Sequence, residues 1–203
     1  TAWRFSPNNQ FAAVLKDNQG NEMPINQWEN TMEWLKPEGK KHIKGIQGQL
    51  WTETVKTSDM VFYYTLPKLL GLAERAWTSE AVWEAKRFSP EREQQLNADW
   101  EIFANKLGQK ELAKLDYIFG GYTYRVPPPG AKILDDKLTI NTPFPVLQVR
   151  FTLDGKEPDS NSQVYTSPIQ LKKGYQLKFA TFTTSGRKSR TVTLPAKEGE
   201  LTD

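Results

Sequence analysis

The sequence predicts an α/β segment followed by a small all-β domain. Residues 45–53 (GIQGQLWTE) alternate in the manner of a strand, and apolar residues at helical spacing follow them. After residue 146 the apolar residues recur at every second position, which is the period of a strand. Between these regions, the run 127–130 (PPPG) can continue neither a helix nor a central strand. We therefore expect an α/β part over 1–126, a proline-rich linker over 127–130 and an all-β domain over 131–203.

The predicted strand has an unusual polar face. In an extended chain, one face carries two amides, an indole and a carboxylate, from Gln47, Gln49, Trp51 and Glu53. The opposite face is suited to packing against a helix. A buried sheet would usually carry Val or Leu at the polar positions, so this face calls for a role other than packing.

Two helices and a shorter third should follow the strand. The first has apolar residues at three- and four-residue spacing over 66–77, and Pro67 should start or kink it. For the second, Ser89 suits the N-cap, Pro90 the first helical position and Gly108 the end. The third is expected over 109–118. A strand followed by a helix is one βα unit of a parallel sheet or barrel.

The first half of the chain is expected to be the tail of a larger domain. A single parallel strand has no partner for its backbone groups, and a complete eight-fold barrel needs roughly 200 residues or more. Residues 8–30 add only a long irregular stretch. A self-contained domain over 1–130 is the alternative.

The second half should consist of short strands that form a small β-sandwich. Alternating apolar residues occur over 147–153 and 175–179, and residues 190–194 (RTVTL) fit a last strand. The pairs Asp154-Gly155 and Asp135-Asp136 are interpreted as turns.

Composition excludes several classes of site and partner. Without cysteine, the chain can form no disulfide, thiolate metal site or cysteine nucleophile. The single histidine, His42, is flanked by lysines and is interpreted as a solvated loop residue. The net charge of +3 resides in residues 131–203, which is too little for a nucleic-acid footprint. No apolar run approaches the roughly 20 residues that span a bilayer, and the first ten residues do not form a signal peptide.

Several motifs, in the right order, resemble the family-twenty glycoside hydrolases, the β-N-acetylhexosaminidases. Residues 45–77 resemble the last barrel strand and helix of that family, with Trp-x-Glu at 51–53 and Ala-Glu-x-x-Trp at 73–77. Residues 103–131 (FANKLGQKELAKLDYIFGGYTYRVPPPGA) look like the bacterial chitobiase branch. Residues 150–171 (RFTLDGKEPDSNSQVYTSPIQL) resemble its closing domain. The resemblance implies the C-terminal end of a (β/α)8 TIM barrel followed by a small immunoglobulin-like β-sandwich.

The resemblance also implies roles for two residues of the polar face. Trp51 looks like one wall of the pocket that holds a terminal N-acetylglucosamine of a chitooligosaccharide. Glu53 looks like the carboxylate that accepts hydrogen bonds from the sugar hydroxyls. The alternative is that Trp51 belongs to a core and that Glu53 pairs with a surface lysine. Trp77, Trp83 and Trp100 are expected to pack helices, and Glu74 to form an ion pair.

The catalytic pair of the family is missing from this sequence. Family-twenty enzymes use the acetamido oxygen of the substrate as nucleophile, with an adjacent Asp-Glu pair and without metal or cofactor. No Asp-Glu dipeptide occurs here, and Asp135-Asp136 lies outside the barrel portion. We therefore expect no catalytic residue in this chain, which should supply pocket contacts and be inert alone, with the N-terminal remainder of the enzyme as a possible partner.

An accessory or carbohydrate-binding module is the alternative function. A chitin-binding sandwich would need a flat row of exposed aromatic residues. Residues 131–203 offer Phe144, Phe151, Tyr165, Tyr175, Phe179 and Phe182 but no Trp, and several fall on core-like positions. Packing is therefore the preferred interpretation of these rings. By family resemblance alone, the expected location is the periplasm or exterior of a bacterium.

Overall fold

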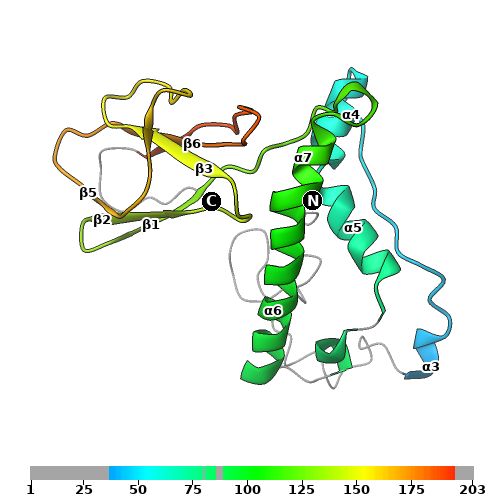
Figure 1. The fold of residues 1–203 in the computed structure, drawn as a ribbon. Helices are drawn as coiled ribbons and strands as arrows, with labels where there is room; N and C mark the ends of the chain where they lie inside the picture. The colour runs from blue at the N-terminus through cyan, green and yellow to red at the C-terminus, as the bar shows by residue number, and fades with distance from the viewer. Residues whose placement is uncertain (1–36, 80, 86–88, 195–203) are drawn as a thin grey trace. The chain divides into compact units, whose positions relative to one another are not determined.

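The computed structural model describes residues 37–79, 81–85 and 89–194 (Figure 1). The chain divides into two compact units, Thr1–Phe103 and Ala104–Asp203, which we call unit 1 and unit 2. The irregular stretch expected over 8–30 lies outside the described residues. The domain bounds expected from the sequence remain a prediction.

The described part of unit 1 is helical. Its elements are α3 (Pro37–Lys40), α4 (Ser58–Thr65), α5 (Lys68–Trp77), a 3-10 turn (Val82–Ala85) and the start of α6 (Pro90–Lys106). Thr57 caps α4, because its hydroxyl accepts a hydrogen bond from the Met60 amide at 3.3 Å. Leu66 is extended and Pro67 follows it, so α5 begins at Lys68. Pro67 therefore starts the helix, as predicted.

Residues 45–53 do not form a strand in the structure. The segment between α3 and α4 is irregular, with a turn in which the Val55 amide donates to the Thr52 carbonyl at 3.0 Å. A strand needs a neighbour to receive its backbone hydrogen bonds, and the described residues of unit 1 offer none. The strand prediction is therefore wrong for this structure.

Helix α6 begins as predicted and continues further than predicted. The Ser89 hydroxyl accepts a hydrogen bond from the Arg92 amide at 3.2 Å, which confirms Ser89 as the N-cap. Instead of ending at Gly108, the helix passes into a π-helical turn (Leu107–Glu111) and then into α7 (Leu112–Leu115). A Cβ atom at Gly108 would lie 2.4 Å from the Pro145 carbonyl oxygen. Gly108 therefore permits a close approach between two segments of unit 2 and does not end the helix.

The predicted all-β part is confirmed, and it consists of two antiparallel sheets (Figure 1). The first sheet has the order β1 (Gly130–Leu134), β2 (Lys137–Asn141) and β5 (Ile169–Gln170). The second has the order β4 (Gln163–Val164), β3 (Gln148–Thr152), β6 (Leu177–Phe182) and β7 (Val192–Leu194). Strands β1 and β2 meet at Asp135-Asp136, where both φ angles are positive (49° and 56°), as a two-residue hairpin turn requires. The turn predicted there is confirmed.

One hydrophobic core lies between the two sheets. The first sheet contributes Leu138 and Ile140, and the second contributes Val149, Phe151, Leu177, Phe179 and Leu194. In β3, buried Val149 and Phe151 alternate with less buried residues, which confirms the predicted period of two. Phe151 lies opposite Phe179 across the β3–β6 pair. Burial of each such side chain contributes about 1.5–3 kcal/mol, so this core accounts for much of the stability of unit 2.

Candidate functional site

The two predicted pocket residues lie on the irregular segment between α3 and α4. The Trp51 side chain is 68% exposed, and Glu53 is also exposed, at the turn formed by residues 52–55. Leu50, which precedes Trp51, is half-buried. Among the described residues nothing encloses either side chain. The interpretation of Trp51 as a core residue is therefore wrong for this structure, whereas the sugar-binding roles of Trp51 and Glu53 remain predictions.

Trp83 organises the helices that follow this segment. It is 5% exposed, and its indole N–H donates to Asp99 Oδ2 at 2.6 Å. The guanidinium carbons of Arg75 and Arg92 lie 5.3 and 5.6 Å from the ring centroid, within the range of cation–π contacts. Arg92 also donates from Nε to the Trp83 carbonyl at 3.2 Å. Trp83 thus joins α5, the 3-10 turn and α6, which confirms that it packs helices.

The surroundings of Trp83 also affect the pKa of Arg75. Burial lowers the pKa of this guanidinium, and the negative charges of Asp99 and Glu74 act in the opposite direction. Glu74 thus acts electrostatically on Arg75, which follows it in the same helix. The ion pair predicted for Glu74 remains a prediction.

The other two tryptophans differ from each other. Trp100 is half-buried, and its ring centroid lies 6.0 Å from that of Phe103 in the same helix, so its packing against another helix remains a prediction. Trp77 is 90% exposed at the end of α5, so the prediction that it packs helices is wrong for the described part of the chain. The spacing of apolar residues that suggested its burial marks a helix face, and no described residue covers that face at Trp77.

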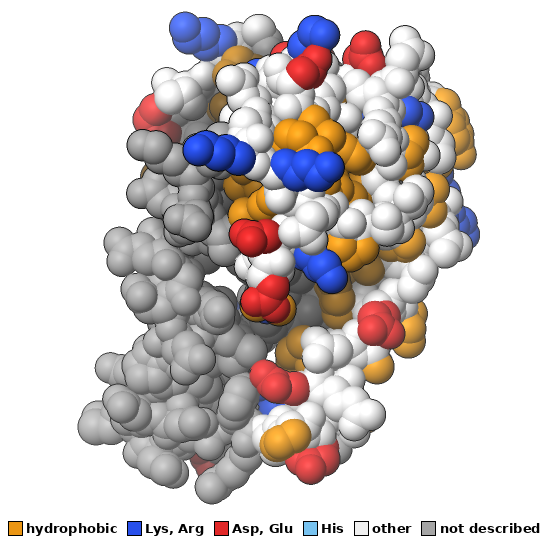
Figure 2. Space-filling view, turned by 90° about the vertical axis from the view of Figure 1, so that its left-hand side faces the viewer, with side chains coloured by type: hydrophobic (Ala, Val, Ile, Leu, Met, Phe, Trp, Pro, Cys, Tyr) orange, Lys and Arg blue, Asp and Glu red, His pale blue; other side chains and the backbone are white. Residues whose placement is uncertain are grey.

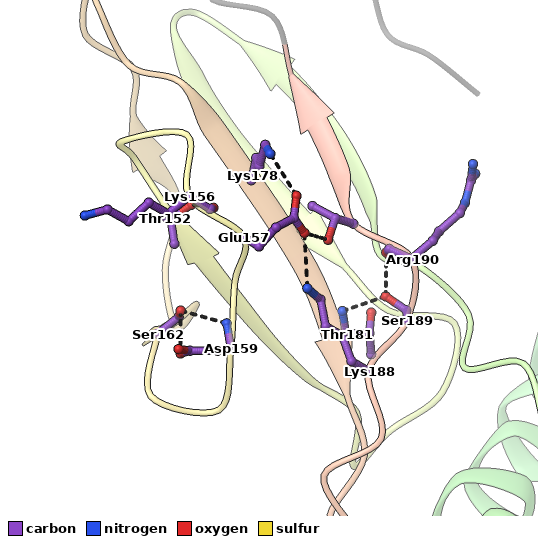
Figure 3. Close-up of polar contacts among 11 residues, drawn as sticks. Thr152, Lys156, Glu157, Asp159, Ser162, Lys178, Thr181, Lys188, Ser189 and Arg190 are labelled. Atoms are coloured by element: carbon purple, nitrogen blue, oxygen red, sulfur yellow. Dashed lines mark hydrogen bonds and ion pairs between the residues drawn. The ribbon is translucent and has the colours of Figure 1, made fainter.

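In the all-β part, the most perturbed carboxylate belongs to a structural network. Glu157 receives hydrogen bonds from Lys178 at 2.8 Å, from Lys188 at 3.2 Å and from the Thr191 hydroxyl at 2.5 Å (Figure 3). These contacts, led by the one from Lys178, lower the pKa of Glu157 to about 2. A strongly perturbed pKa can indicate a catalytic group, but this carboxylate is exposed and held by two lysines. It tethers β6 to the segment that leads into β7, and we assign it a structural role.

The aromatic residues of the all-β part are mostly internal. Phe144, Phe151, Phe179 and Phe182 are buried, and Tyr165 and Tyr175 are half-buried. The Tyr165 hydroxyl accepts a hydrogen bond from the Ile140 amide at 3.0 Å. The preference for packing over a flat binding row is therefore confirmed for these residues.

The surface of the described part carries charges of both signs. On the face shown in Figure 2, Lys and Arg side chains lie among acidic, apolar and neutral ones.

His42 is exposed beside α3, as predicted for a loop residue. Within the described ranges, no helix combines the length and the apolar composition that crossing a membrane requires.

Comparison with known families gives a match to each half of the chain. Residues 111–191 match the model of the chitobiase/beta-hexosaminidase C-terminal domain. Residues 3–80, which include Trp51 and Glu53, match the model of the glycosyl hydrolase family 20 catalytic domain. The chain belongs to the family-20 glycoside hydrolases. The resemblance inferred from the sequence motifs is thereby confirmed.

Curated relatives of this family-20 chain are longer than the chain itself. N,N'-diacetylchitobiase of Vibrio harveyi is 39% identical over 125 residues, which cover 57% of this chain and 14% of that protein. Beta-hexosaminidase of Vibrio vulnificus is 32% identical over 217 residues, which cover 95% of this chain and 23% of that protein. Beta-hexosaminidase of Porphyromonas gingivalis is 30% identical over 158 residues, which cover 73% of this chain and 18% of that protein. The chain thus spans less than a quarter of the length of each of these relatives.

Proposed function

We propose that this chain supplies part of the substrate pocket of a β-N-acetylhexosaminidase of the chitobiase type. The parent enzyme would remove terminal N-acetylglucosamine from chitooligosaccharides. The observation that carries the proposal is the family-20 catalytic-domain match over residues 3–80, because it includes both Trp51 and Glu53. The names of the relatives, chitobiase and beta-hexosaminidase, support the substrate class.

In this proposal Trp51 binds the sugar through its ring. An indole face can cover the apolar face of a pyranose, and an aromatic contact of this size contributes about 0.5–1.5 kcal/mol. The side chain is 68% exposed in the structure, so its face is accessible to a ligand. Binding of this kind holds the sugar in position and does not itself transfer a proton.

Glu53 would hold the same sugar by its hydroxyl groups. A carboxylate accepts hydrogen bonds only, so its partners must be O–H or N–H donors such as the hydroxyls of a terminal N-acetylglucosamine. A hydrogen bond to a charged group contributes roughly 1.5–3 kcal/mol. Trp51 and Glu53 are two residues apart and would lie on one face of the segment if it were extended in the parent enzyme.

The acid and the acetamido-orienting residue would come from elsewhere in the parent enzyme. The proposed reaction is substrate-assisted and retaining: the acetamido oxygen attacks the anomeric carbon, and an Asp-Glu pair stabilises the acetamido group and protonates the leaving oxygen. This sequence contains no Asp-Glu dipeptide. We therefore assign no catalytic residue to this chain and no metal or cofactor to the reaction.

The fold and location of the parent are part of the same proposal. Residues 1–126 would provide the end of a (β/α)8 barrel, in which the segment 45–53 becomes the eighth strand once its neighbours are present. The two sheets of unit 2 would form an immunoglobulin-like sandwich. The enzyme would act in the bacterial periplasm or outside the cell, where chitooligosaccharides are met, and cell fractionation with an activity assay tests this location.

Turnover of a chromogenic N-acetyl-β-D-glucosaminide tests the assignment of catalysis. The purified 203-residue chain is expected to release no chromophore above a protein-free blank, while a full-length family-20 homologue does so under the same conditions. Turnover that persists after repeated chromatography would contradict the proposal, since it would require an acid within this chain.

An accessory carbohydrate-binding module remains the second candidate. It is weakened for the sheets, because the aromatic residues there are buried or half-buried. It is favoured by one other observation, the exposed rings of Tyr117 and Phe119, which precede the proline run.

A further inference from the structure

Unit 2 displays exposed aromatic side chains in a stretch without charge. Residues 117–124 (YIFGGYTY) contain no acidic or basic residue and are flanked by Asp116, which follows α7, and by Arg125, which precedes the proline run. Phe119 is 91% exposed and Tyr117 is 67% exposed. The ring of Phe119 lies 6.4 Å from that of Tyr122, centroid to centroid, at an interplanar angle of 72°. The two rings thus form a T-shaped pair, and Phe119 stays largely open to solvent.

The backbone holds Phe119 in an unfavourable conformation. Its φ is 52° and its ψ is 34°, in the left-handed region that bulky residues seldom adopt. The turn is fixed on both sides, because the Gly121 amide donates to Ile118 at 2.9 Å and the Tyr122 amide donates to Leu115 at 2.7 Å. A side chain at Gly121 would also clash, since a Cβ atom would lie 2.6 Å from the Asp116 carbonyl oxygen. The position of Phe119 is therefore set by the turn.

Packing within unit 2 does not explain a strained and exposed phenylalanine. Glycine or asparagine would fit the same turn with less strain, and exposure of a large apolar ring gains nothing for folding. Strained residues that persist in a structure cluster at binding and catalytic sites. Phe119 therefore has the features of a residue kept for a contact with another molecule.

The chemistry of the stretch indicates an uncharged ligand with an apolar face. Asp116, the nearest charged residue before the rings, is already paired with Arg187 at 2.6 Å. Residues 117–124 offer no cationic side chain to an anionic ligand, and the arginine that lies beside Gly121 is Arg187, which Asp116 already engages. The sugar rings of a chitooligosaccharide are neutral and present apolar C–H faces, which suit exposed aromatic rings.

We propose that Phe119 and Tyr117 form an auxiliary sugar-binding platform, on which a ring of a chitooligosaccharide stacks. The choice of ligand rests on the proposed function, because that function supplies the substrate class. The platform belongs to unit 2 and uses none of the predicted pocket residues. It would retain a chain of several sugars whose end is held in the pocket of the parent enzyme.

The variant Phe119→Gly tests the platform without damaging the fold. Glycine adopts a positive φ readily, so the melting temperature should stay unchanged or rise. The Kd of the 203-residue chain for N-acetylchitohexaose, measured by isothermal titration calorimetry, should increase roughly two- to tenfold, as expected for loss of one aromatic contact. Phe119→Tyr should bind like the unmodified chain. Leu134→Ala, which truncates another exposed apolar side chain of unit 2, is the matched control and should leave the Kd unchanged.

Three outcomes would overturn the platform. The first is a Phe119→Gly variant that binds the hexaose as tightly as the unmodified chain. If Trp51→Ala weakens binding in the same experiment, the proposed function stands and only the platform fails. The second is an unmodified chain without affinity for the hexaose. The third is a Phe119-dependent dimer in sedimentation velocity with no change in sugar affinity, which would make these rings a contact between copies of the chain. If instead Trp51→Ala has no effect while Phe119→Gly weakens binding, the platform stands and the pocket assignment fails.

Discussion

Arg187 donates a hydrogen bond from Nε to Asp116 Oδ1 at 2.6 Å, joining the turn after β6 to the residue that follows α7. The Arg187 guanidinium carbon also lies 4.9 Å from the centroid of the Tyr124 ring. Tyr124 is buried, and burial together with the nearby charge of Asp116 raises the pKa of its hydroxyl to about 12. These contacts bind the residues before the proline run to the all-β part of unit 2.

Replacement of Arg187 should therefore destabilise unit 2. Asp116 and Arg187 are about one-fifth and one-third exposed, so the pair is only partly screened by water. Arg187→Ala leaves the Asp116 carboxylate without this donor and should lower the free energy of unfolding by about 1–3 kcal/mol. Urea denaturation followed by circular dichroism measures the change. Arg190→Ala, which truncates an exposed arginine close by, is the control, and an equal effect of both variants would contradict the assignment.

Gly108→Ala should destabilise the chain although alanine favours helices. On helix propensity alone the substitution would stabilise by up to about 1 kcal/mol. The new Cβ atom would instead lie 2.4 Å from the Pro145 carbonyl oxygen, and overpacking of this kind costs about 1–3 kcal/mol. Thermal melts of Gly108→Ala and of Gly45→Ala, which has nothing within 4 Å of the added atom, compare the two cases. If Gly108→Ala melts at a higher temperature than the unmodified chain, the gain in helix propensity outweighs the contact with Pro145, and the prediction is wrong.

Trp83→Phe should destabilise unit 1 by removing a donor from a buried position. Phenylalanine retains most of the apolar ring but leaves Asp99 without the indole N–H that now lies at 2.6 Å. We expect a loss of about 1–3 kcal/mol in the free energy of unfolding. Trp77→Phe is the matched control, because Trp77 is 90% exposed and its replacement should change the stability by less than about 0.5 kcal/mol. Comparable losses for both variants would contradict the role given to Trp83.

Glu157 should contribute stability that depends on pH. Its pKa falls from an ordinary value of 4.5 to about 2 in the folded chain, chiefly because Lys178 donates to it. A carboxylate with a lowered folded pKa stabilises the native state above its unfolded pKa and loses that contribution as the pH falls towards the folded value. The difference in melting temperature between the unmodified chain and Glu157→Gln should thus be full at pH 7 and shrink steadily between about pH 5 and pH 2. A difference that stays constant over this range would count against the network.

Local sequence signals predicted the elements whose causes are local. Ser89 caps α6 and Pro67 precedes α5, because capping and the missing proline donor act within a few residues. The alternation around Val149 and Phe151 gave β3 and its buried face correctly. Asp135-Asp136 forms the expected turn, since aspartate tolerates a positive φ.

Features that depend on distant contacts were missed. The strand expected at 45–53 is absent from the structure, because pairing requires a neighbouring strand that the described residues do not supply. Gly108 looked like a helix end, and only the approach of Pro145 reveals why glycine is required there. The exposure of Phe119 could not be anticipated, although the run of aromatic and glycine residues over 117–122 was a visible signal of an unusual turn.

The candidate site could be predicted only in part. Trp51 and Glu53 came from a motif shared with a family, and the catalytic-domain match over 3–80 includes both residues. The geometry of a pocket depends on which other segments of the chain surround these two side chains. The spacing of residues within 45–53 does not predict those neighbours.

Binding of N,N'-diacetylchitobiose to the 203-residue chain and to its variants tests the central claim most directly. Saturation-transfer NMR should detect the ligand on the unmodified chain, with a signal that Trp51→Ala and Glu53→Gln each reduce severalfold and that Trp77→Ala leaves intact. Trp77 is the matched control because it is also an exposed tryptophan of unit 1. Equal signals from the unmodified chain and Trp51→Ala, or a loss in Trp77→Ala alone, would contradict the assignment of Trp51 to the sugar pocket.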